Sequence, residues 1–347
     1  MTWTASGSEF LVNSTTSGNQ ELSSVAALSS GGYLVTWTDY SASSGDTSQL
    51  AIRAQAYDSS SNVIGDEFLV NTTTSKDQYD SYVLGLSNGG FVVAWTDLSL
   101  SSDDTSATAI RAQVFDSSFS KVGSEFLVNT STSSEQTSSS LAALNSGKFV
   151  AVWSDGSNSG SDNSLGAVRG QLFDGTGSKI GSEFLVNTTT LRGQDEPSTA
   201  SSGSGFIVAF TDNSRSTDDP SAGAIRAQRF NLDGSKNGSE FLVNTTTTGD
   251  QRKPSVDILT NGSFVVTWST EGADSFRDIR GQMFDSSGSK IGSEFSVNTT
   301  TNYDQYDSRV IALSGGGFVV FWTDREGGGS DQSGFSVRGQ HYSGTGE

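Results

Sequence analysis

The sequence predicts an all-β fold: a six-bladed β-propeller of four-stranded antiparallel blades, closed by the N-terminal strand, which completes the last blade. Three observations predict it. The phrase GSEFLVN, or a near copy, occurs six times along the 347 residues. The apolar runs between the copies are short and rich in Val, Ile, Phe and Trp. The chain begins with one copy, whereas the last unit lacks one.

The repeat period is read from the glutamate of the phrase, whose successive copies are 58, 58, 58, 57 and 54 residues apart. These glutamates are Glu9, Glu67, Glu125, Glu183, Glu240 and Glu294. A glutamine, a strand-terminal aromatic residue and an arginine in an Arg-x-Gln run keep the same period. Units of this length with several strands are typical of propeller blades, whereas the coils of a β-solenoid are usually much shorter.

The second unit illustrates the predicted strands. It reads SYVLGL, FVVAWTD, AIRAQVFD and GSEFLVN, separated by Gly-, Asn-, Asp- and Ser-rich stretches. Such short, β-branched and aromatic runs favour strands over helices, and we expect no helix. The Gly-Gly pair in SNGGF at 87–91 predicts a tight hairpin, because glycine supplies the positive φ that such turns require.

Residues 1–347 are expected to form a single propeller domain. The predicted blades span 20–77, 78–135, 136–193, 194–250, 251–304, and 305–347 together with 1–19. Residues 7–13 would supply the outer strand that the sixth blade lacks and so remove an exposed strand edge. Because the sequence starts and ends within a repeat, we also expect it to be part of a larger chain.

The charge balance limits the partners. There are 39 Asp and Glu against 20 Lys and Arg, a formal net charge of −19, which disfavours nucleic acid and anionic membranes. No stretch is long and apolar enough for membrane insertion. The absence of cysteine excludes thiolate catalysis and disulfides.

Few residues offer catalytic chemistry. The single histidine, His341, occupies a slot that other units fill with Ala56, Val114 or Leu172, which indicates a tolerated substitution. A Ser-His-Asp triad or a zinc site therefore lacks parts. A glycosidase needs only two carboxylates, but no unit shows a distinctive carboxylate pair that breaks the repeat. We therefore expect the chain not to be an enzyme and to have no catalytic residues.

The repeated arginines have a predicted local partner. In five units an aspartate stands 14 residues before the arginine, on the neighbouring antiparallel strand. A cross-strand ion pair in each blade is the expected arrangement, instead of the arginine cluster of a sialidase. The fifth unit has Thr270 at this position, so its pairing is expected to differ.

The loops between these residues suggest a metal. A second aspartate follows the first by seven residues, with Ser, Gly and Asn between them, and calcium prefers such oxygen ligands. The candidate calcium ligands are Asp39, Asp46, Asp97, Asp104, Asp155, Asp162, Asp212, Asp219, Asp324 and Asp331. We expect these residues in solvent-facing loops. A solvated loop without metal is the alternative, since Asp, Ser and Gly are ordinary loop residues.

The combined pattern SVAALSSGGYLVTWTD, AIRAQ and GSEFLVN resembles repeats of very large secreted bacterial proteins, many of which also carry hemolysin-type calcium-binding (RTX) repeats. That resemblance covers essentially the whole chain. It implies an extracellular or cell-surface location, secretion without an N-terminal signal, and an adhesin-like role. The glycine-rich calcium-binding nonapeptide is missing here, so the resemblance implies no calcium roll.

Two functional classes remain. The first is a non-enzymatic binding or scaffold module, stabilised by calcium, whose partners are surface glycans or other extracellular proteins. The second is a carbohydrate-binding lectin-type propeller with Trp and Arg in pockets between blades; a glycan-processing enzyme is a further alternative. The alternation of Phe91, Val93 and Trp95 favours the inter-blade core as the place of the tryptophans.

Overall fold

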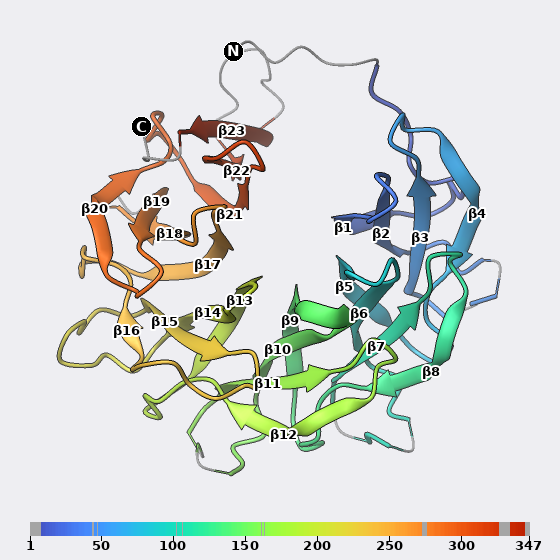
Figure 1. Cartoon of the computed structure of the whole chain (residues 1–347), viewed down its shortest axis with the longest axis horizontal. Coiled ribbons are helices and arrows are strands. Elements are labelled where there is room, and N and C mark those ends of the chain that lie inside the picture. Colours follow the sequence, from blue (N-terminus) through green and yellow to red (C-terminus); the bar gives the residue numbers. More distant parts are fainter. Residues whose placement is uncertain are drawn as a thin grey trace.

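The computed structural model describes residues 8–343 apart from 44, 47, 102, 106, 161, 163, 273–275 and 326–333. It confirms the predicted fold class, because six antiparallel sheets follow one another around a central axis (Figure 1). No α-helix occurs in these described residues; Asn145–Gly147 forms a single short 3-10 turn. Accordingly, the described part holds no helix that could cross a membrane.

Each sheet takes its strands in chain order. The first three sheets contain β1 (Gln20–Ala27), β2 (Tyr33–Asp39), β3 (Ala51–Tyr57) and β4 (Val63–Leu69); β5 (Gln78–Gly85), β6 (Phe91–Asp97), β7 (Ala109–Phe115) and β8 (Lys121–Leu127); β9 (Gln136–Ala143), β10 (Phe149–Asp155), β11 (Ala167–Phe173) and β12 (Lys179–Leu185). The last three contain β13 (Gln194–Ser202), β14 (Gly205–Asp212), β15 (Ala224–Asn231) and β16 (Phe241–Leu242); β17 (Gln251–Ile258), β18 (Phe264–Glu271), β19 (Arg277–Phe284) and β20 (Lys290–Ser296); β21 (Gln305–Ala312), β22 (Phe318–Asp324) and β23 (Ser336–Tyr342).

The first strand of each sheet lies nearest the axis and the last lies at the rim (Figure 1). The hairpin predicted at 87–91 connects β5 to β6, where Leu86 N donates to Gly90 O at 2.8 Å and Gly89 has a φ of 95°. A β-bulge interrupts the first strand of every sheet shortly after its glutamine. Such a bulge changes the direction of the side chains next to the axis.

The sixth sheet differs from the prediction of four strands per blade. It contains β21, β22 and β23, and none of residues 8–13 is paired with β23 in the described part of the chain. Gly7, the first residue of the expected closing strand, lies outside the described residues. The described N-terminal segment is instead held on the first sheet, where the Phe10 and Tyr57 rings lie 5.3 Å apart and Tyr57 Oη donates to Val12 O at 3.0 Å.

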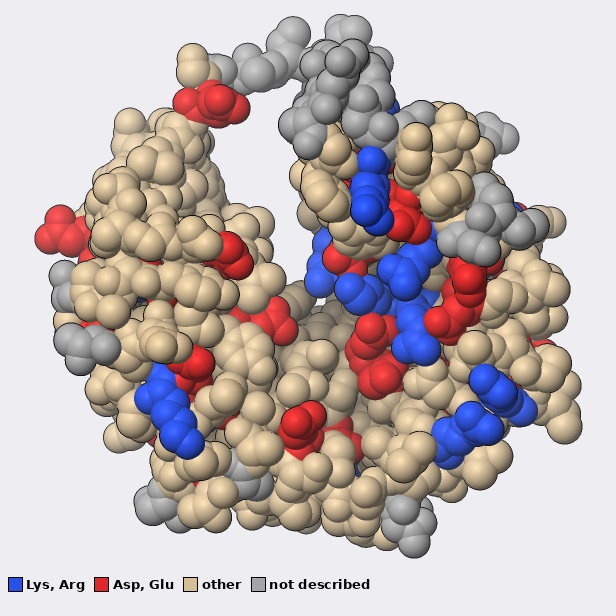
Figure 2. Space-filling view, turned by 180° about the vertical axis from the view of Figure 1, so that it is seen from behind, with Lys and Arg blue, Asp and Glu red and all other residues tan. Residues whose placement is uncertain are grey.

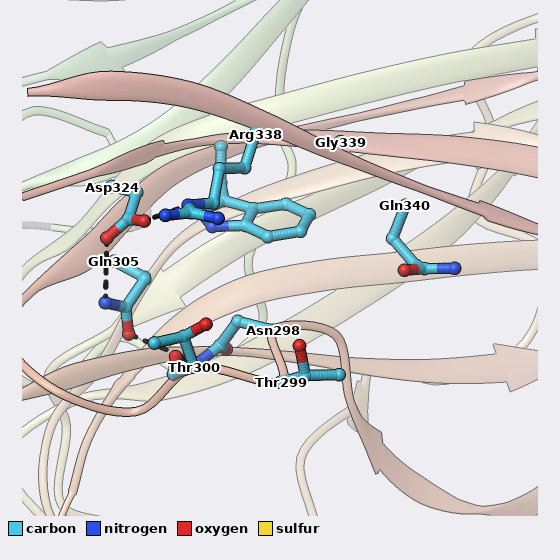
Figure 3. Close-up of a pocket in the computed structure, with 9 residues that line it drawn as sticks. Asn298, Thr299, Thr300, Gln305, Asp324, Arg338, Gly339 and Gln340 are labelled. Carbon is cyan, nitrogen blue, oxygen red and sulfur yellow. Dashed lines mark hydrogen bonds and ion pairs between the residues drawn. The ribbon is translucent and has the colours of Figure 1, made fainter. Parts of the chain in front are cut away.

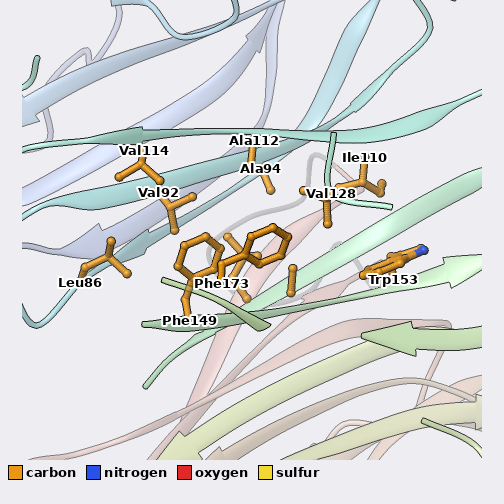
Figure 4. Close-up of a cluster of buried hydrophobic side chains, with 12 residues drawn as sticks. Leu86, Val92, Ala94, Ile110, Ala112, Val114, Val128, Phe149, Trp153 and Phe173 are labelled. Atoms are coloured by element: carbon orange, nitrogen blue, oxygen red, sulfur yellow. The ribbon is translucent and has the colours of Figure 1, made fainter. Parts of the chain in front are cut away.

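The hydrophobic core is divided among the interfaces between successive sheets. In the cluster between the second and third sheets, Trp153 lies with Phe149 and Phe173, whose rings stack 5.0 Å apart (Figure 4). Burying one such aromatic side chain stabilises a fold by about 1.5–3 kcal/mol. Trp37, Trp95, Trp153, Trp268 and Trp322 are all buried at the equivalent position. The tryptophans therefore belong to the core, as the alternation in the sequence predicts.

Candidate functional site

The repeated aspartate and arginine form the predicted cross-strand pairs. Arg53 Nε lies 2.7 Å from an Asp39 carboxylate oxygen, and the same pair recurs as Arg111 with Asp97, Arg169 with Asp155, Arg226 with Asp212 and Arg338 with Asp324. Burial alone would raise the pKa of Asp39, but hydrogen bonds from Ser41, Gln20 and Arg53 outweigh it and hold that pKa below its usual range. These five arginines are fixed by structural ion pairs within their own blades.

The glutamate of GSEFLVN extends this network to the neighbouring sheet. Glu125 lies 3.3 Å from Arg111 Nη1 and accepts hydrogen bonds from Thr72 N and from Thr73 N and Oγ1, which precede the second sheet. Glu67 binds Ser14 and Thr15 in the same way, and these hydrogen bonds lower its pKa against the raising effect of burial. The phrase is therefore repeated because it joins blades.

The second aspartate of each loop belongs to a different buried network. Asp46 Oδ1 accepts hydrogen bonds from Ser48 N at 2.8 Å and from its hydroxyl, while Oδ2 accepts one from Asn71 Nδ2 at 2.8 Å. Asn71 also donates to Gln78, which in turn donates to Asp97 of the next sheet. The asparagine of the repeated phrase and the glutamine that follows it therefore recur because they form hydrogen bonds between neighbouring blades.

The candidate calcium ligands are thus placed in two separate roles. The first-position residues Asp39, Asp97, Asp155, Asp212 and Asp324 pair with arginine, and the second-position residues Asp46, Asp104, Asp162 and Asp219 bind asparagine. All nine are at most 4 % exposed, so the expectation of solvent-facing loops is wrong. Asp331 lies outside the described residues. Within the described residues, no group of three or more His, Cys, Asp or Glu side chains could hold a metal ion.

The six blades differ from one another at a position of the innermost strands, next to the axis. The residue two positions after the glutamine has a φ between 53° and 55° in all six bulges, but its chemistry changes from blade to blade. These residues are Leu22, Asp80, Ser138, Glu196, Lys253 and Asp307. The residue just before each of them also differs between the six first strands (Glu21, Tyr79, Thr137, Asp195, Arg252 and Tyr306), so the blades differ in charge where these strands follow their glutamines. Figure 2 shows acidic and basic side chains gathered around the central hollow.

The fourth blade contributes Glu196 to this ring and places a second carboxyl group, Asp195, next to it in the chain. Glu196 Oε2 accepts hydrogen bonds from Lys253 N at 3.0 Å and Thr211 Oγ1 at 2.9 Å, which fix its direction. Burial and the neighbouring Glu196 charge raise the pKa of Asp195 to about 6, although Arg252 and Asn213 act in the opposite direction. One Asp195 oxygen, Oδ1, is buried without a hydrogen-bond partner. Asp195 is therefore a carboxyl group that keeps a substantial protonated fraction at mildly acidic pH, up to about pH 6.

Charged groups of the second, fifth and sixth blades complete the ring. Asp80 is exposed to solvent, yet the walls of the hollow reduce its hydration and raise its pKa, an effect opposed by the positive charges of Arg309 and Lys253. Lys253 Nζ forms an ion pair with Asp307 at 2.6 Å. Burial also raises the pKa of Asp257, whose carboxylate accepts hydrogen bonds from Ile258 N and Ala312 N. The site combines carboxyl groups whose pKa is raised with the cations Lys253 and Arg309.

This arrangement has the components of acid–base chemistry on a glycosidic bond. Such chemistry needs one carboxyl group that is protonated near neutral pH and a second that stays ionised. Asp195 can supply the proton at mildly acidic pH, and Glu196 and Asp80 are the other carboxyl groups at the axis. His341, by contrast, is exposed on β23 at the rim, away from this ring.

No family model matches the chain, and no curated protein matches it. Several solved structures are similar to the chain in fold. An α-L-arabinanase from Penicillium chrysogenum complexed with arabinobiose is 13% identical, with a TM-score of 0.60 and 93% of each chain covered. An α-L-arabinofuranosidase from Fusarium graminearum is 13% identical, with a TM-score of 0.59 and the same coverage. A sialidase from Streptococcus pneumoniae is 9% identical, with a TM-score of 0.57, covering 94% of this chain and 68% of that one.

These likenesses show that the chain has the β-propeller fold shared by several glycoside hydrolases. They overturn the expectation that the chain is not an enzyme. That expectation rested on the uniform repeat and on a single histidine in a substitutable slot, but glycosidic bonds are hydrolysed by two carboxyl groups without a histidine. The sequence did hold a signal for the site: reading the position two residues after each glutamine finds Asp80, Glu196 and Asp307.

Proposed function

We propose that the chain is a glycan-directed propeller whose central hollow hydrolyses a glycosidic bond. The observation that carries this proposal is the inner ring, where four of the six residues are charged (Asp80, Glu196, Lys253 and Asp307), together with Asp195 beside Glu196, whose pKa is raised to about 6. The likeness to arabinan- and sialoside-cleaving propellers supports the glycan class. Among their substrates, α-L-arabinofuranosides are the first to test.

The roles follow from the environments of the carboxyl groups. Asp195 would protonate the leaving glycosidic oxygen, since its raised pKa keeps the acid form populated at mildly acidic pH. Glu196, oriented by Lys253 N and Thr211, or Asp80 would act as the second carboxylate. The charged groups around them, such as the Lys253–Asp307 pair, would position sugar hydroxyls.

The test is release of reducing sugar from a panel of arabinans, sialosides and other glycans, with binding measured on the same panel by calorimetry. Asp195→Asn, Glu196→Gln and Asp80→Asn are each compared with Asp66→Asn, an exposed residue of β4 at the rim. We expect Asp195→Asn to lose about 10²–10⁴-fold in rate while binding persists. Binding without hydrolysis by the wild-type chain would instead establish a lectin, and neither binding nor hydrolysis would overturn the proposal.

Calcium, an extracellular location and adhesin-like partners stay predictions of the sequence. The buried hydrogen-bond networks account for the acidic loop residues without a metal. Glycan recognition at the axis is compatible with a surface or secreted protein, which is the setting that the sequence resemblance implies. The glycan panel addresses the site itself and does not depend on where the protein works.

A further inference from the structure

The ring has one interface that differs from the rest. Five hydrophobic clusters join successive sheets, from the first to the sixth. Within the described residues no such cluster joins the sixth sheet to the first, and Figure 1 shows a gap between β23 and the sheet of β1 to β4. One face of the first sheet and one face of the sixth sheet border this gap.

Both faces carry apolar side chains that are buried at equivalent places elsewhere. Val337 of β23 is 78% exposed, whereas Ile52, Ile110, Val168, Ile225 and Ile279 at the same position are 0% exposed. Those isoleucines and valine face the following blade, as Ile52 does in its cluster with Val83. On the first sheet, Val25 is 64% exposed, whereas its counterpart Val83 is 2% exposed against the preceding blade. The sixth and first sheets therefore present the two halves of a normal inter-blade core.

The N-terminal segment already makes the contacts of a preceding blade's outer strand. Phe10 lies on Tyr57 at 5.3 Å, as Phe295 of β20 lies on Tyr342 at 5.4 Å. Tyr57 Oη donates to Val12 O, as Tyr342 Oη donates to Val297 O. Residues 8–13 are thus docked on the first sheet in the position that the fourth strand of a sixth blade would take.

The sixth blade carries a matching pocket of about 270 Å³. It is lined by Thr299, Thr300 and Arg338, together with Asp324 and Gln305 (Figure 3). In the fifth blade the corresponding place holds Glu294, which accepts hydrogen bonds from Thr245 N, Thr246 N and Thr246 Oγ1. Glu67, Glu125, Glu183 and Glu240 hold this place in the other four blades. The pocket therefore has the composition of a carboxylate receptor.

We infer that this pocket receives Glu9 of the same chain and that residues 8–13 pair with β23 as its fourth strand. The register follows from the other blades, where the arginine lies opposite the second residue after the glutamate, as Arg53 lies opposite Leu69. Leu11 would then lie opposite Arg338. Pairing would also cover Val337 and Val25 and so form a sixth inter-blade core. The occupant is this chain and not a second copy, because the segment is already held on the chain's own first sheet.

Cysteine cross-linking tests the strand pairing, and the chain has no cysteine of its own. The test is a double variant, Leu11→Cys with Arg338→Cys. The positive control is a second double variant, Arg53→Cys with Leu69→Cys, which replaces the equivalent arginine and its partner in a strand pair that the structure shows. We expect both variants to form a disulfide within one monomer, seen by intact mass and loss of free thiols. A covalent dimer would show strand exchange between copies, and free thiols in the first variant alone would show no pairing; either result overturns the inference.

Hydrogen exchange tests the pocket in the otherwise intact chain. The Thr299 and Thr300 amides should exchange as slowly as those of Thr245 and Thr246, which bind Glu294. Glu9→Ala should speed exchange at Thr299 and Thr300 at least tenfold and leave Thr245 and Thr246 unchanged. Exchange at Thr299 and Thr300 that does not respond to Glu9→Ala would overturn the assignment of Glu9. Both measurements are independent of glycan hydrolysis, so they can fail without affecting the proposed function.

Discussion

Asp195 illustrates how a single residue links stability to function. Its pKa is raised from 3.8 to about 6, so the folded state binds a proton more tightly than the unfolded state between these pH values. Folding stability is therefore lost as the pH rises through 6, the reverse of the usual behaviour of a carboxylate in an ion pair. A carboxyl group that destabilises the fold at neutral pH and lies beside the charged ring residue Glu196 is typical of a functional site.

The first prediction is that Asp195→Asn stabilises the protein at pH 7.5 while it abolishes activity. Two pKa units correspond to up to about 3 kcal/mol, and the gain should vanish at pH 3.5, where the native carboxyl is also neutral. Urea unfolding at the two pH values measures it. If Asp195→Asn destabilised the protein equally at both pH values, Asp195 would instead be held by structural contacts.

The second prediction concerns the buried loop aspartates. Asp162→Asn places an amide donor against the Asn187 amide group, which donates to Asp162 Oδ2 at 2.7 Å. Loss of this hydrogen bond to a charged acceptor should cost about 1.5–3 kcal/mol. The comparison is Asp66→Asn, an exposed carboxylate on β4, which should change stability by less than about 0.5 kcal/mol. Equal melting temperatures for both variants would contradict the buried network.

The fifth blade shows what one missing residue does to an element. Thr270 replaces the aspartate that elsewhere pairs with arginine, and Arg280 Nε is buried without a hydrogen-bond partner. Among the described residues, Arg280 forms an ion pair with Glu294, at 3.7 Å. The hairpin of β18 and β19 still forms, because its pairing is set by the apolar pattern and the backbone ladder.

The third prediction is a matched exchange between blades. Thr270→Asp should raise the melting temperature by supplying Arg280 with the missing partner, which is worth about 1 kcal/mol. Asp97→Thr should lower stability by about 3–5 kcal/mol, since it leaves the buried Arg111 without that carboxylate. Thermal melting of the two variants checks both signs. A loss from Thr270→Asp as large as that from Asp97→Thr would mean that the fifth blade has adapted to threonine.

The elements also show how far the sequence could predict the structure. Strand positions, the Asp–Arg pairs and the buried tryptophans follow from the period and the alternation, because each blade repeats the same local physics. The bulge at Glu196 could not be predicted, since its positive φ depends on how the inner strand meets Ser154 of the preceding blade, whose Oγ accepts a hydrogen bond from Glu196 N at 3.0 Å. The charged ring was therefore missed although its residues stand at a fixed distance from the glutamines.

The burial of Asp46 was missed for a related reason. In the sequence it lies in a polar Ser- and Gly-rich stretch, which is typical of solvated loops. The structure folds that stretch back onto Asn71, at the start of the connection to the next blade. Polarity in the sequence here reflects a hydrogen-bonded interior, in which Asp46 accepts hydrogen bonds from Ser48 and Asn71.

At the scale of the whole molecule, the formal net charge of −19 produces a self-repulsion that depends on salt. The fourth prediction is that raising ionic strength from about 0.01 M to 0.1 M, where the Debye length falls from about 30 to 10 Å, raises the melting temperature. Calcium and magnesium are then compared at equal ionic strength. The sequence prediction of calcium sites requires a further rise with calcium alone, about 2.7 kcal/mol per site at a hundredfold excess over Kd; equal melts with both ions would reject it.

The central claim is that a six-bladed ring of structural repeats carries one catalytic centre at its axis. The most direct measurement is the pH dependence of kcat/KM for glycan hydrolysis by the wild-type chain and by Asp195→Asn. We predict that the wild-type rate falls as the pH rises above about 6, because the proton donor is lost, and that the variant loses about 10²–10⁴-fold without this limb. A variant with the wild-type rate and the wild-type pH profile would contradict the account.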